Sequence, residues 1–171
     1  MAGALSKARG MSAAPRRTAP AALRGRAAVP GDKSISHRAL ILAALAVGES
    51  RIGGLNDGAD VAATAAALAA MGARIGSDAD GARRVAGAGV GGLIDPAAAL
   101  DLGNSGTAAR LLIGLAASHP IRAVFTGDAS LRRRPMDRIA APLRRIGARI
   151  DADRLPLTVE GTAAAIPARH R

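Results

Sequence analysis

Two stretches of the chain repeat one order of apolar and polar positions. Residues 68–75 (LAAMGARI) and 143–150 (LRRIGARI) share the pattern L-x-x-[M/I]-G-A-R-I at a distance of 75 residues. Upstream, Arg38 and Arg110 are each followed by an apolar run, and here the distance is 72 residues. Self-similarity at a fixed spacing predicts two copies of one structural unit.

Each copy is predicted to contain two helices of different character. Residues 36–47 and 107–117 are apolar on all sides, which is typical of a buried helix. Residues 60–72 and 136–146 carry their apolar side chains on one stripe at helical spacing. These two segments are therefore expected to lie against the core with one face.

Glycines mark the ends of the second helix in each copy. Gly72 and Gly147 are expected to stop these helices, and each leads into a short β-prone piece around Ile75 or Ile150. Pro142 falls inside the last helix and is expected to bend it.

The other β-prone stretches are short and precede or connect the helices. They cover residues 23–29, 51–55, 83–86, 121–126 and 157–160. Strands mixed with one buried and one outer helix per copy predict an α/β or α+β fold made of repeated units.

The net charge of +11 is distributed unevenly along the chain. Residues 1–30 carry six Lys or Arg and no acid, and residues 122–149 carry eight basic residues against two acids. Residues 1–22 lack a hydrophobic period and are expected to form a disordered basic tail, although organellar presequences have a similar composition. The second excess centres on residues 132–134.

Composition restricts the partners of these cations. Single-stranded nucleic acid is commonly bound by aromatic stacking, and the chain has one Phe and no Trp or Tyr. A site for small anions is therefore the better interpretation, with a basic nucleic-acid-binding module as an alternative. The longest strongly apolar run, residues 39–47, is nine residues long and too short to span a membrane.

No metal site is expected. The chain has no Cys, and its three histidines at positions 37, 119 and 170 are scattered. His37 is expected to be a packed or solvated side chain rather than a catalytic one. Residues 87–92 (GAGVGG) fit the dinucleotide pattern G-x-G-x-x-G, but no long helix opens there, so they are interpreted as a strand end and loop.

The first site candidate is the segment 31–38 (GDKSISHR), where a turn enters a buried helix. Helix N-termini attract phosphate and carboxylate groups. Lys33 adds a point charge, Ser34 adds a hydroxyl donor, and Arg38 offers a planar fork on the same helix face. The alternative is ordinary N-capping by Ser34 or Ser36 with a solvated lysine and arginine.

Residues 103–107 (GNSGT) occupy the equivalent place before the second buried helix and its Arg110. Two glycines would allow a ligand to approach the backbone closely. The alternative is a simple turn with Thr107 as the helix cap. The repetition of this feature at a matching helix start favours a site shared by both segments.

Residues 126–135 (TGDASLRRRP) end a strand and enter a helix with Pro135 near its first turn. Arg134 is fixed beside that proline, so it is the arginine expected to face a ligand. Arg132 and Arg133 are expected to be solvent-exposed. The residues alone do not separate the three arginines.

Three segments in this order resemble the signatures of the 5-enolpyruvylshikimate-3-phosphate synthases, the 3-phosphoshikimate 1-carboxyvinyltransferases. They are residues 30–38 (PGDKSISHR), 102–110 (LGNSGTAAR) and 126–135 (TGDASLRRRP). The resemblance implies a fold of two domains, each with three βαβαββ units around buried helices. Residues 23–171 would then form an incomplete first domain with about two of the three units.

The resemblance also implies separate roles for the site residues. Lys33 would touch both substrates, Ser34 and Arg38 would bind shikimate 3-phosphate, and Gly106 and Arg134 would bind phosphoenolpyruvate. The supporting positions on the same wall would be Asn104, Thr107 and Arg110.

The implied reaction transfers the enolpyruvyl group of phosphoenolpyruvate to the 5-hydroxyl of shikimate 3-phosphate and releases phosphate, without a metal or organic cofactor. In the family, the groups assigned to proton transfer lie in the second domain. No carboxylate of this chain matches them, so no catalytic residue is expected here and the chain alone is expected to be inactive. A monomeric, cytoplasmic enzyme is implied.

The UDP-N-acetylglucosamine enolpyruvyl transferases share this fold and are the nearest alternative. In them an Asn follows the lysine equivalent to Lys33, and the segment Gly-Asn-Ser-Gly-Thr is not expected. Ser34 and residues 103–107 therefore favour the shikimate enzymes.

Overall fold

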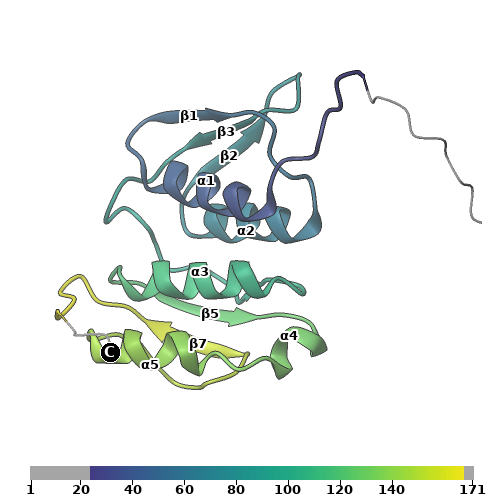
Figure 1. Cartoon of the computed structure of the whole chain (residues 1–171). Helices are drawn as coiled ribbons and strands as arrows, with labels where there is room; N and C mark the ends of the chain where they lie inside the picture. The colour runs from purple at the N-terminus through teal and green to yellow at the C-terminus, as the bar shows by residue number, and fades with distance from the viewer. Residues whose placement is uncertain (1–23, 168–171) are drawn as a thin grey trace, which may run out of the picture.

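The structure is a computed structural model that describes residues 24–167. The tail predicted at residues 1–22 lies outside the described residues. The described chain forms two units stacked on one another (Figure 1). Within this part of the chain, no helix has the length and apolar character needed to cross a membrane.

The first unit consists of two helices and a three-stranded antiparallel sheet in the order β1-β3-β2. Its elements are α1 (Lys33–Leu45), β1 (Glu49–Ile52), α2 (Ala59–Ala70), β2 (Arg74–Ser77) and β3 (Arg83–Ala86). The stretch predicted at 83–86 is confirmed as a strand, and the strand predicted at 51–55 begins two residues earlier.

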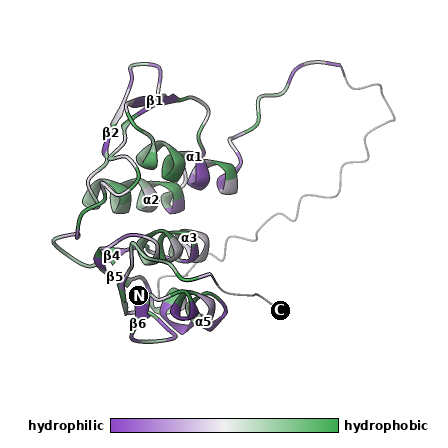
Figure 2. Cartoon of the chain, turned by 90° about the vertical axis from the view of Figure 1, so that its left-hand side faces the viewer, coloured by the Kyte–Doolittle hydropathy of each residue, from purple (hydrophilic) through white to green (hydrophobic). Residues whose placement is uncertain are grey.

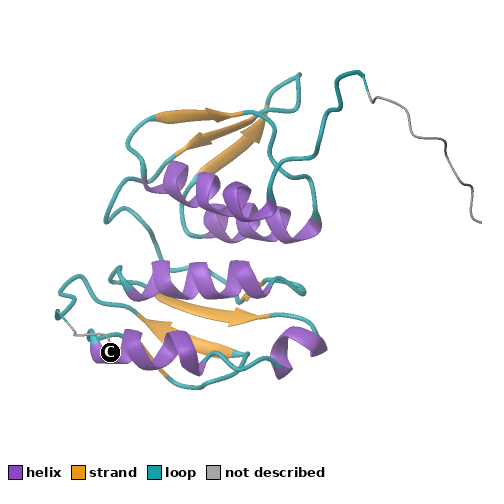
Figure 3. Ribbon diagram, viewed as in Figure 1, coloured by secondary structure: helices purple, strands orange, loops and turns teal. Residues whose placement is uncertain are grey.

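The second unit begins with a strand that has no counterpart in the first. Its elements are β4 (Leu100–Asp101), α3 (Gly106–Ala117), β5 (Arg122–Thr126), α4 (Ala129–Arg133), α5 (Asp137–Arg145), β6 (Arg149–Ile150) and β7 (Leu157–Glu160). The sheet order is β4-β5-β7-β6, with β4 parallel to β5 and the other pairs antiparallel. Apart from the additional short helix α4, this unit has the order βαβαββ (Figure 3).

Equivalent glycines confirm that the two units repeat one design. Gly87 follows β3 and packs on the end of α1, and Gly161 follows β7 and packs on the end of α3. A Cβ atom added to Gly87 would overlap the carbonyl oxygen of Ala43, and one added to Gly161 would overlap that of Ala116. Both positions therefore require a residue without a side chain.

The helix caps change the alignment of the two units. The N-caps of α1 and α3 are Asp32 and Ser105, which lie 73 positions apart rather than 72. In this register Arg110 corresponds to His37 and not to Arg38. The C-terminal ends of the helices, Leu45 and Ala117, nevertheless lie 72 positions apart, and Arg38 and Arg110 are both exposed whereas His37 is buried. The pairing of Arg38 with Arg110 therefore agrees with the exposure of the two side chains, and only the helix starts are offset by one residue.

The core lies between the helices and the inner faces of the sheets. Side chains alternate along β5 and β7, so that Phe125 and Val159 are buried while Arg122 and Glu160 are exposed on the outer face. Figure 2 shows the same division, with apolar residues concentrated in α1 and α2 and hydrophilic ones on β1 and β6.

Two predictions about the first unit were wrong. Residues 24–29 form no strand: all six are exposed, and the segment runs away from the body of the molecule, where no strand pairs with its backbone (Figure 1). The first helix is also not buried on all sides, because Ile35 and Leu42 of α1 are 68% and 67% exposed. In contrast, α3 lies between the first unit and the second sheet and is buried along most of its surface.

Candidate functional site

The second and third sequence motifs meet at the carboxyl ends of two parallel strands. The backbone N–H of Leu102, after β4, donates to the carbonyl of Thr126 at the end of β5 (3.1 Å). The N–H of Asp128 in turn donates to the carbonyl of Gly103 (2.8 Å). Ligands of open sheets commonly bind outside the carboxyl ends of parallel strands, and the two loops are joined at such an edge.

Three side chains form a hydrogen-bonded chain across these loops. Asp128 accepts from the side-chain N–H of Asn104 (Oδ2 to Nδ2, 2.7 Å), and Asn104 Oδ1 accepts from Arg134 Nη2 (2.6 Å). The other oxygen of Asp128 accepts from the backbone N–H of Leu131 (2.7 Å) and caps α4. The hydrogen bond from Asn104 and then that from Leu131 lower the pKa of Asp128, which keeps this carboxylate ionised near neutral pH.

Arg134 is distinguished from its neighbours by its surroundings. Its side chain is partly buried, whereas Arg132 and Arg133 are exposed. One edge of its guanidinium is held by Asn104, and its Nη1 lies beside Gly106, the first residue of α3. Of the three arginines, Arg134 is therefore the one that is held beside the start of α3, and its role in binding a ligand stays a prediction.

Replacing Gly106 with alanine is expected to weaken anion binding without unfolding the chain. The added Cβ atom would lie 2.8 Å from Arg134 Nη1. Because the neighbour is the end of a flexible side chain, the guanidinium can move away, and it then loses its alignment with the start of α3. We expect about a tenfold weaker binding of a small phosphate or carboxylate anion at this edge, measured by isothermal titration calorimetry.

Gly114→Ala provides the control for this change. Gly114 lies in the same helix, and no atom lies within 4 Å of a Cβ atom placed there. Equal affinities of the Gly106→Ala and Gly114→Ala chains would contradict a role for Gly106 in the site.

The start of α1 is capped by a residue that sequence reasoning did not select. Asp32 is the N-cap, and its Oδ1 accepts from the backbone N–H of Ile35 (2.7 Å). The alternative in which Ser34 or Ser36 caps this helix was wrong. The hydroxyl of Ser36 donates to the carbonyl of Asp32 (2.7 Å), whereas Ser34 is exposed and its hydroxyl has no hydrogen-bond partner within residues 24–167.

The same correction applies to the start of α3. Ser105 caps this helix by accepting from the N–H of Ala108 (3.2 Å), so Thr107 is not the cap. Thr107 is exposed at the helix start instead. Both helix starts therefore carry a hydroxyl side chain, on Ser34 and on Thr107, that has no hydrogen-bond partner within residues 24–167 and lies next to backbone N–H groups.

The cations at α1 differ in what holds them. Lys33 Nζ lies 2.9 Å from Asp60 Oδ2 in the first turn of α2. Arg38 is exposed and its Nη1 donates to the backbone carbonyl of Ser34 (3.0 Å). Asp60 was not recognised as a site residue, because its contact with Lys33 depends on the packing of α2 against α1.

His37 is packed in the interface of α1 and α2. Its ring is fully buried, its Nδ1 lies 2.7 Å from Thr64 Oγ1, and its Nε2 has no partner among the described residues. Burial lowers the pKa of His37; the charges of Lys33 and Arg38 act in the same direction and Asp60 opposes them. His37 is therefore neutral near pH 7 and supports the site by packing.

Acidification from about pH 7 to pH 5 is expected to lower the free energy of unfolding through His37. Its folded pKa lies below its unfolded value of about 6.5, so the unfolded chain takes up a proton that the folded chain does not. Urea denaturation across this pH range should show the decrease in the unmodified chain and a smaller one in the His37→Gln chain. The same slope in both chains would contradict this assignment.

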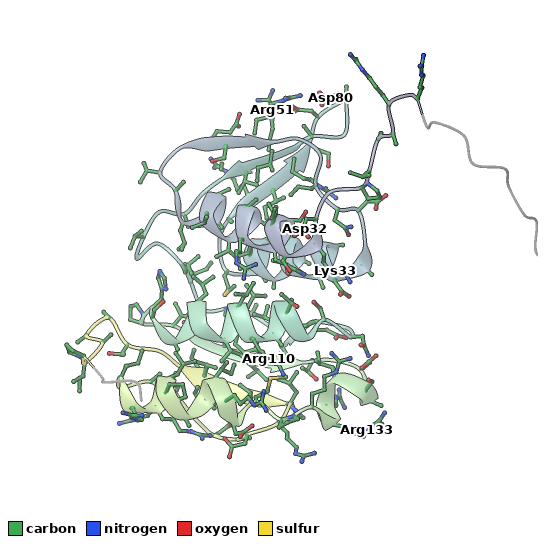
Figure 4. The ribbon with its side chains drawn as sticks, in the orientation of Figure 1. Asp32, Lys33, Arg51, Asp80, Arg110 and Arg133 are labelled. Atoms are coloured by element: carbon green, nitrogen blue, oxygen red, sulfur yellow. The ribbon has the colours of Figure 1, made fainter. Side chains whose placement is uncertain are left out.

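The two helix starts lie on the same side of the molecule. Figure 1 shows α1 and α3 both beginning on the right-hand side, with α4 below the start of α3, and Figure 4 places Lys33 on that side of α1. Arg110 projects from α3, is exposed, and makes no side-chain hydrogen bond within residues 24–167. This side of the molecule thus combines two helix N-termini with several cations, an arrangement suited to a ligand with more than one negative charge.

Two pockets elsewhere on the surface are less suited to an anionic ligand than this site. One of about 430 Å³ lies on the outer face of the second sheet, among Arg122, Arg149 and Glu160. There Glu160 pairs with both arginines, at 3.6 and 3.8 Å, and Asp151 is a second carboxylate in the lining, so acidic groups offset much of the positive charge. A groove of about 350 Å³ between α1 and α3 is lined by Arg38 and otherwise mainly by apolar side chains.

The fold and the site define a mixed α/β protein of repeated units with an edge that is suited to anions. The family model of EPSP synthase (3-phosphoshikimate 1-carboxyvinyltransferase) matches residues 17–167, and the chain belongs to this family.

Relatives and solved structures give the same result. The chain is 58% identical over 161 residues to a 3-phosphoshikimate 1-carboxyvinyltransferase of Novosphingobium aromaticivorans, which covers 92% of this chain and 36% of the relative. It is 60% identical over 146 residues to one of Granulibacter bethesdensis, covering 84% and 32%. An EPSP synthase structure from Acinetobacter baumannii superposes with a TM-score of 0.76 at 43% identity, covering 80% of this chain and 32% of that one. The chain spans about a third of the length of these relatives.

Proposed function

We propose that this chain supplies part of the substrate site of an enolpyruvyl transferase that acts on shikimate 3-phosphate and phosphoenolpyruvate. The observation that carries the proposal is the convergence of Gly106, Asn104 and Arg134 at the start of α3, on the side of the molecule where α1 presents Lys33. The names of the relatives support the choice of substrates.

Each cation has a distinct task in this proposal. Lys33 contacts both substrates, and Ser34 and Arg38 bind shikimate 3-phosphate. Arg134 and the backbone N–H of Gly106 bind phosphoenolpyruvate. The free hydroxyl of Ser34 and the fork of Arg38 fit this role, because phosphate accepts hydrogen bonds from both kinds of donor.

In the proposed reaction, the 5-hydroxyl of shikimate 3-phosphate gives up its proton as its oxygen bonds to carbon 2 of phosphoenolpyruvate, and carbon 3 takes a proton and becomes a methyl group. Loss of one methyl proton and of phosphate then restores the double bond. Fixed cations stabilise the anionic substrates and the tetrahedral intermediate between these steps. We assign no proton transfer to residues 24–167, and we propose a monomeric cytoplasmic enzyme as the setting of this segment.

Calorimetric titration of the chain with shikimate 3-phosphate tests the proposal. We expect binding that is lost with shikimate, which lacks the phosphate, and that is weak or absent with UDP-N-acetylglucosamine. Binding of shikimate as tight as that of its 3-phosphate would contradict the site.

A titration with a single-stranded DNA oligonucleotide tests the nucleic-acid alternative, which the excess of basic residues motivates. Electrostatic binding to DNA weakens steeply as salt is added. Submicromolar DNA binding near physiological ionic strength, without binding of shikimate 3-phosphate, would favour the alternative.

A further inference from the structure

We propose that Asp128 is a positioning residue for Arg134 and acts through the side-chain amide of Asn104. The inference deepens the proposed function and rests on it for the identity of the ligand. Its physical basis is the order of donors and acceptors in the hydrogen bonds that connect Asp128 to Asn104 and Asn104 to Arg134.

The amide of Asn104 has two chemically different ends, and only one orientation suits both neighbours. An ionised carboxylate can only accept hydrogen bonds, so the NH₂ end of Asn104 must face Asp128. A guanidinium can only donate, so the oxygen end must face Arg134. The carboxylate thereby fixes the oxygen of Asn104 as an acceptor for Arg134 Nη2, at 2.6 Å.

Asp128 itself is held from three directions. Its Oδ1 caps α4 at Leu131, its Oδ2 binds Asn104, and its backbone N–H donates to the carbonyl of Gly103. Gly127, directly before it, packs so closely on Gly103 that an added Cβ atom would lie 2.7 Å from the carbonyl oxygen. The position of this carboxylate is therefore set by the two loops that form the site edge.

As a consequence, one edge of the Arg134 guanidinium is bound to Asn104, and another part of it lies at the start of α3. Nη2 is engaged by Asn104, while Nη1 lies beside Gly106 at the start of α3. A guanidinium fixed in this way loses less conformational freedom when an anion binds. Asp128 would thus raise affinity without touching the ligand.

The competing interpretation is that Asp128 only caps α4. Asparagine is as good an N-cap as aspartate, so a pure cap would tolerate Asp128→Asn. In the positioning interpretation, the same change reverses the direction of the hydrogen bonds from position 128 to Arg134. If the oxygen of the new amide side chain caps the helix, its NH₂ group faces Asn104. The amide of Asn104 then turns its oxygen toward position 128 and its NH₂ toward Arg134, where two donors meet.

The experiment uses two variants of the whole 171-residue chain. The first is Asp128→Asn. The second is Asp128→Ser, because serine can cap the helix but is too short to reach Asn104. Asp137→Asn is the control, because it removes an equal charge from an exposed position in the first turn of α5. The first readout is the order of the Arg134 guanidinium in the ligand-free chain, from its side-chain ¹⁵N–¹H resonances. The second is the affinity for phosphoenolpyruvate.

We expect both Asp128 variants to lose the ordered Arg134 resonance and to bind phosphoenolpyruvate about tenfold more weakly, with Asp137→Asn unchanged. An ordered Arg134 in both variants would overturn the positioning role. If the unmodified chain bound no phosphoenolpyruvate, the proposed function would fail, and the guanidinium resonances would still decide whether Asp128 positions Arg134. If Asp128→Asn did not fold, Asp128→Ser would decide in the same way.

Discussion

Replacing Gly161 with alanine is expected to give the largest loss of stability among the variants considered. Gly161 follows β7 and lies against the end of α3, where an added Cβ atom would overlap the carbonyl oxygens of Ala116 and His119. Both obstacles are backbone atoms, so no rotation of a side chain can relieve the overlap. Overpacking of this kind costs typically 1–3 kcal/mol and more where the backbone must shift, against a total stability of about 5–15 kcal/mol for a domain.

Thermal unfolding followed by circular dichroism measures this effect. We expect a loss of about 3 kcal/mol or more for Gly161→Ala. Gly114→Ala should preserve or raise the stability by up to about 1 kcal/mol, because it replaces a helical glycine that has open space around it. Equal stability of the Gly161→Ala chain and the unmodified chain would show that the end of α3 is not packed against this turn.

Replacing Lys33 with alanine is expected to give the largest loss of ligand binding. In the proposed site Lys33 contacts both substrates, and in the ligand-free chain its ammonium group is held by Asp60 at 2.9 Å and is half exposed. Hydrogen bonds to charged groups contribute about 1.5–3 kcal/mol each. The affinity for shikimate 3-phosphate should therefore fall by about 10- to 100-fold, measured by calorimetry.

Arg133→Ala is the matched control for Lys33→Ala. It removes the same charge from an exposed position beside the site residue Arg134. Its effect on affinity should be small, because exposed charges act mainly through long-range attraction that salt screens. Similar losses for both variants at physiological salt would mean that net charge, and not the contacts of Lys33, determines binding.

The sequence predicted most of the elements because local signals and packing agree in them. The strands at residues 83–86 and 157–160 have the bounds that were expected, and the helices α2 and α5 lie where the apolar stripes indicated. The prediction of a strand at residues 24–29 was wrong because a strand needs a neighbour, and none of the strands within residues 24–167 pairs with this segment. The exposure of α1 could not be predicted either, since an all-apolar sequence does not say how many of its faces are covered.

The sequence pattern indicated the cations of the candidate site but not its carboxylates. Lys33 and Arg134 could be selected because they stand beside a helix start and a proline. Asp60 and Asp128 come close to other site residues 27 and 24 positions away in the chain, through contacts that only the packing of the units creates. A sequence signal did exist for Asp128, since an aspartate directly before a short helix is a typical N-cap, but its second bond to Asn104 has no local pattern.

The central claim is that the starts of α1 and α3 bind one polyanionic ligand together. It is tested most directly by assigning the backbone ¹⁵N–¹H resonances of the chain and titrating with shikimate 3-phosphate and then phosphoenolpyruvate. The claim predicts that shikimate 3-phosphate shifts residues 33–38 and that phosphoenolpyruvate, added to this complex, shifts residues 104–107 and Arg134. Shifts confined to exposed arginines such as Arg132 and Arg133, or no shifts at either helix start at millimolar ligand, would contradict it.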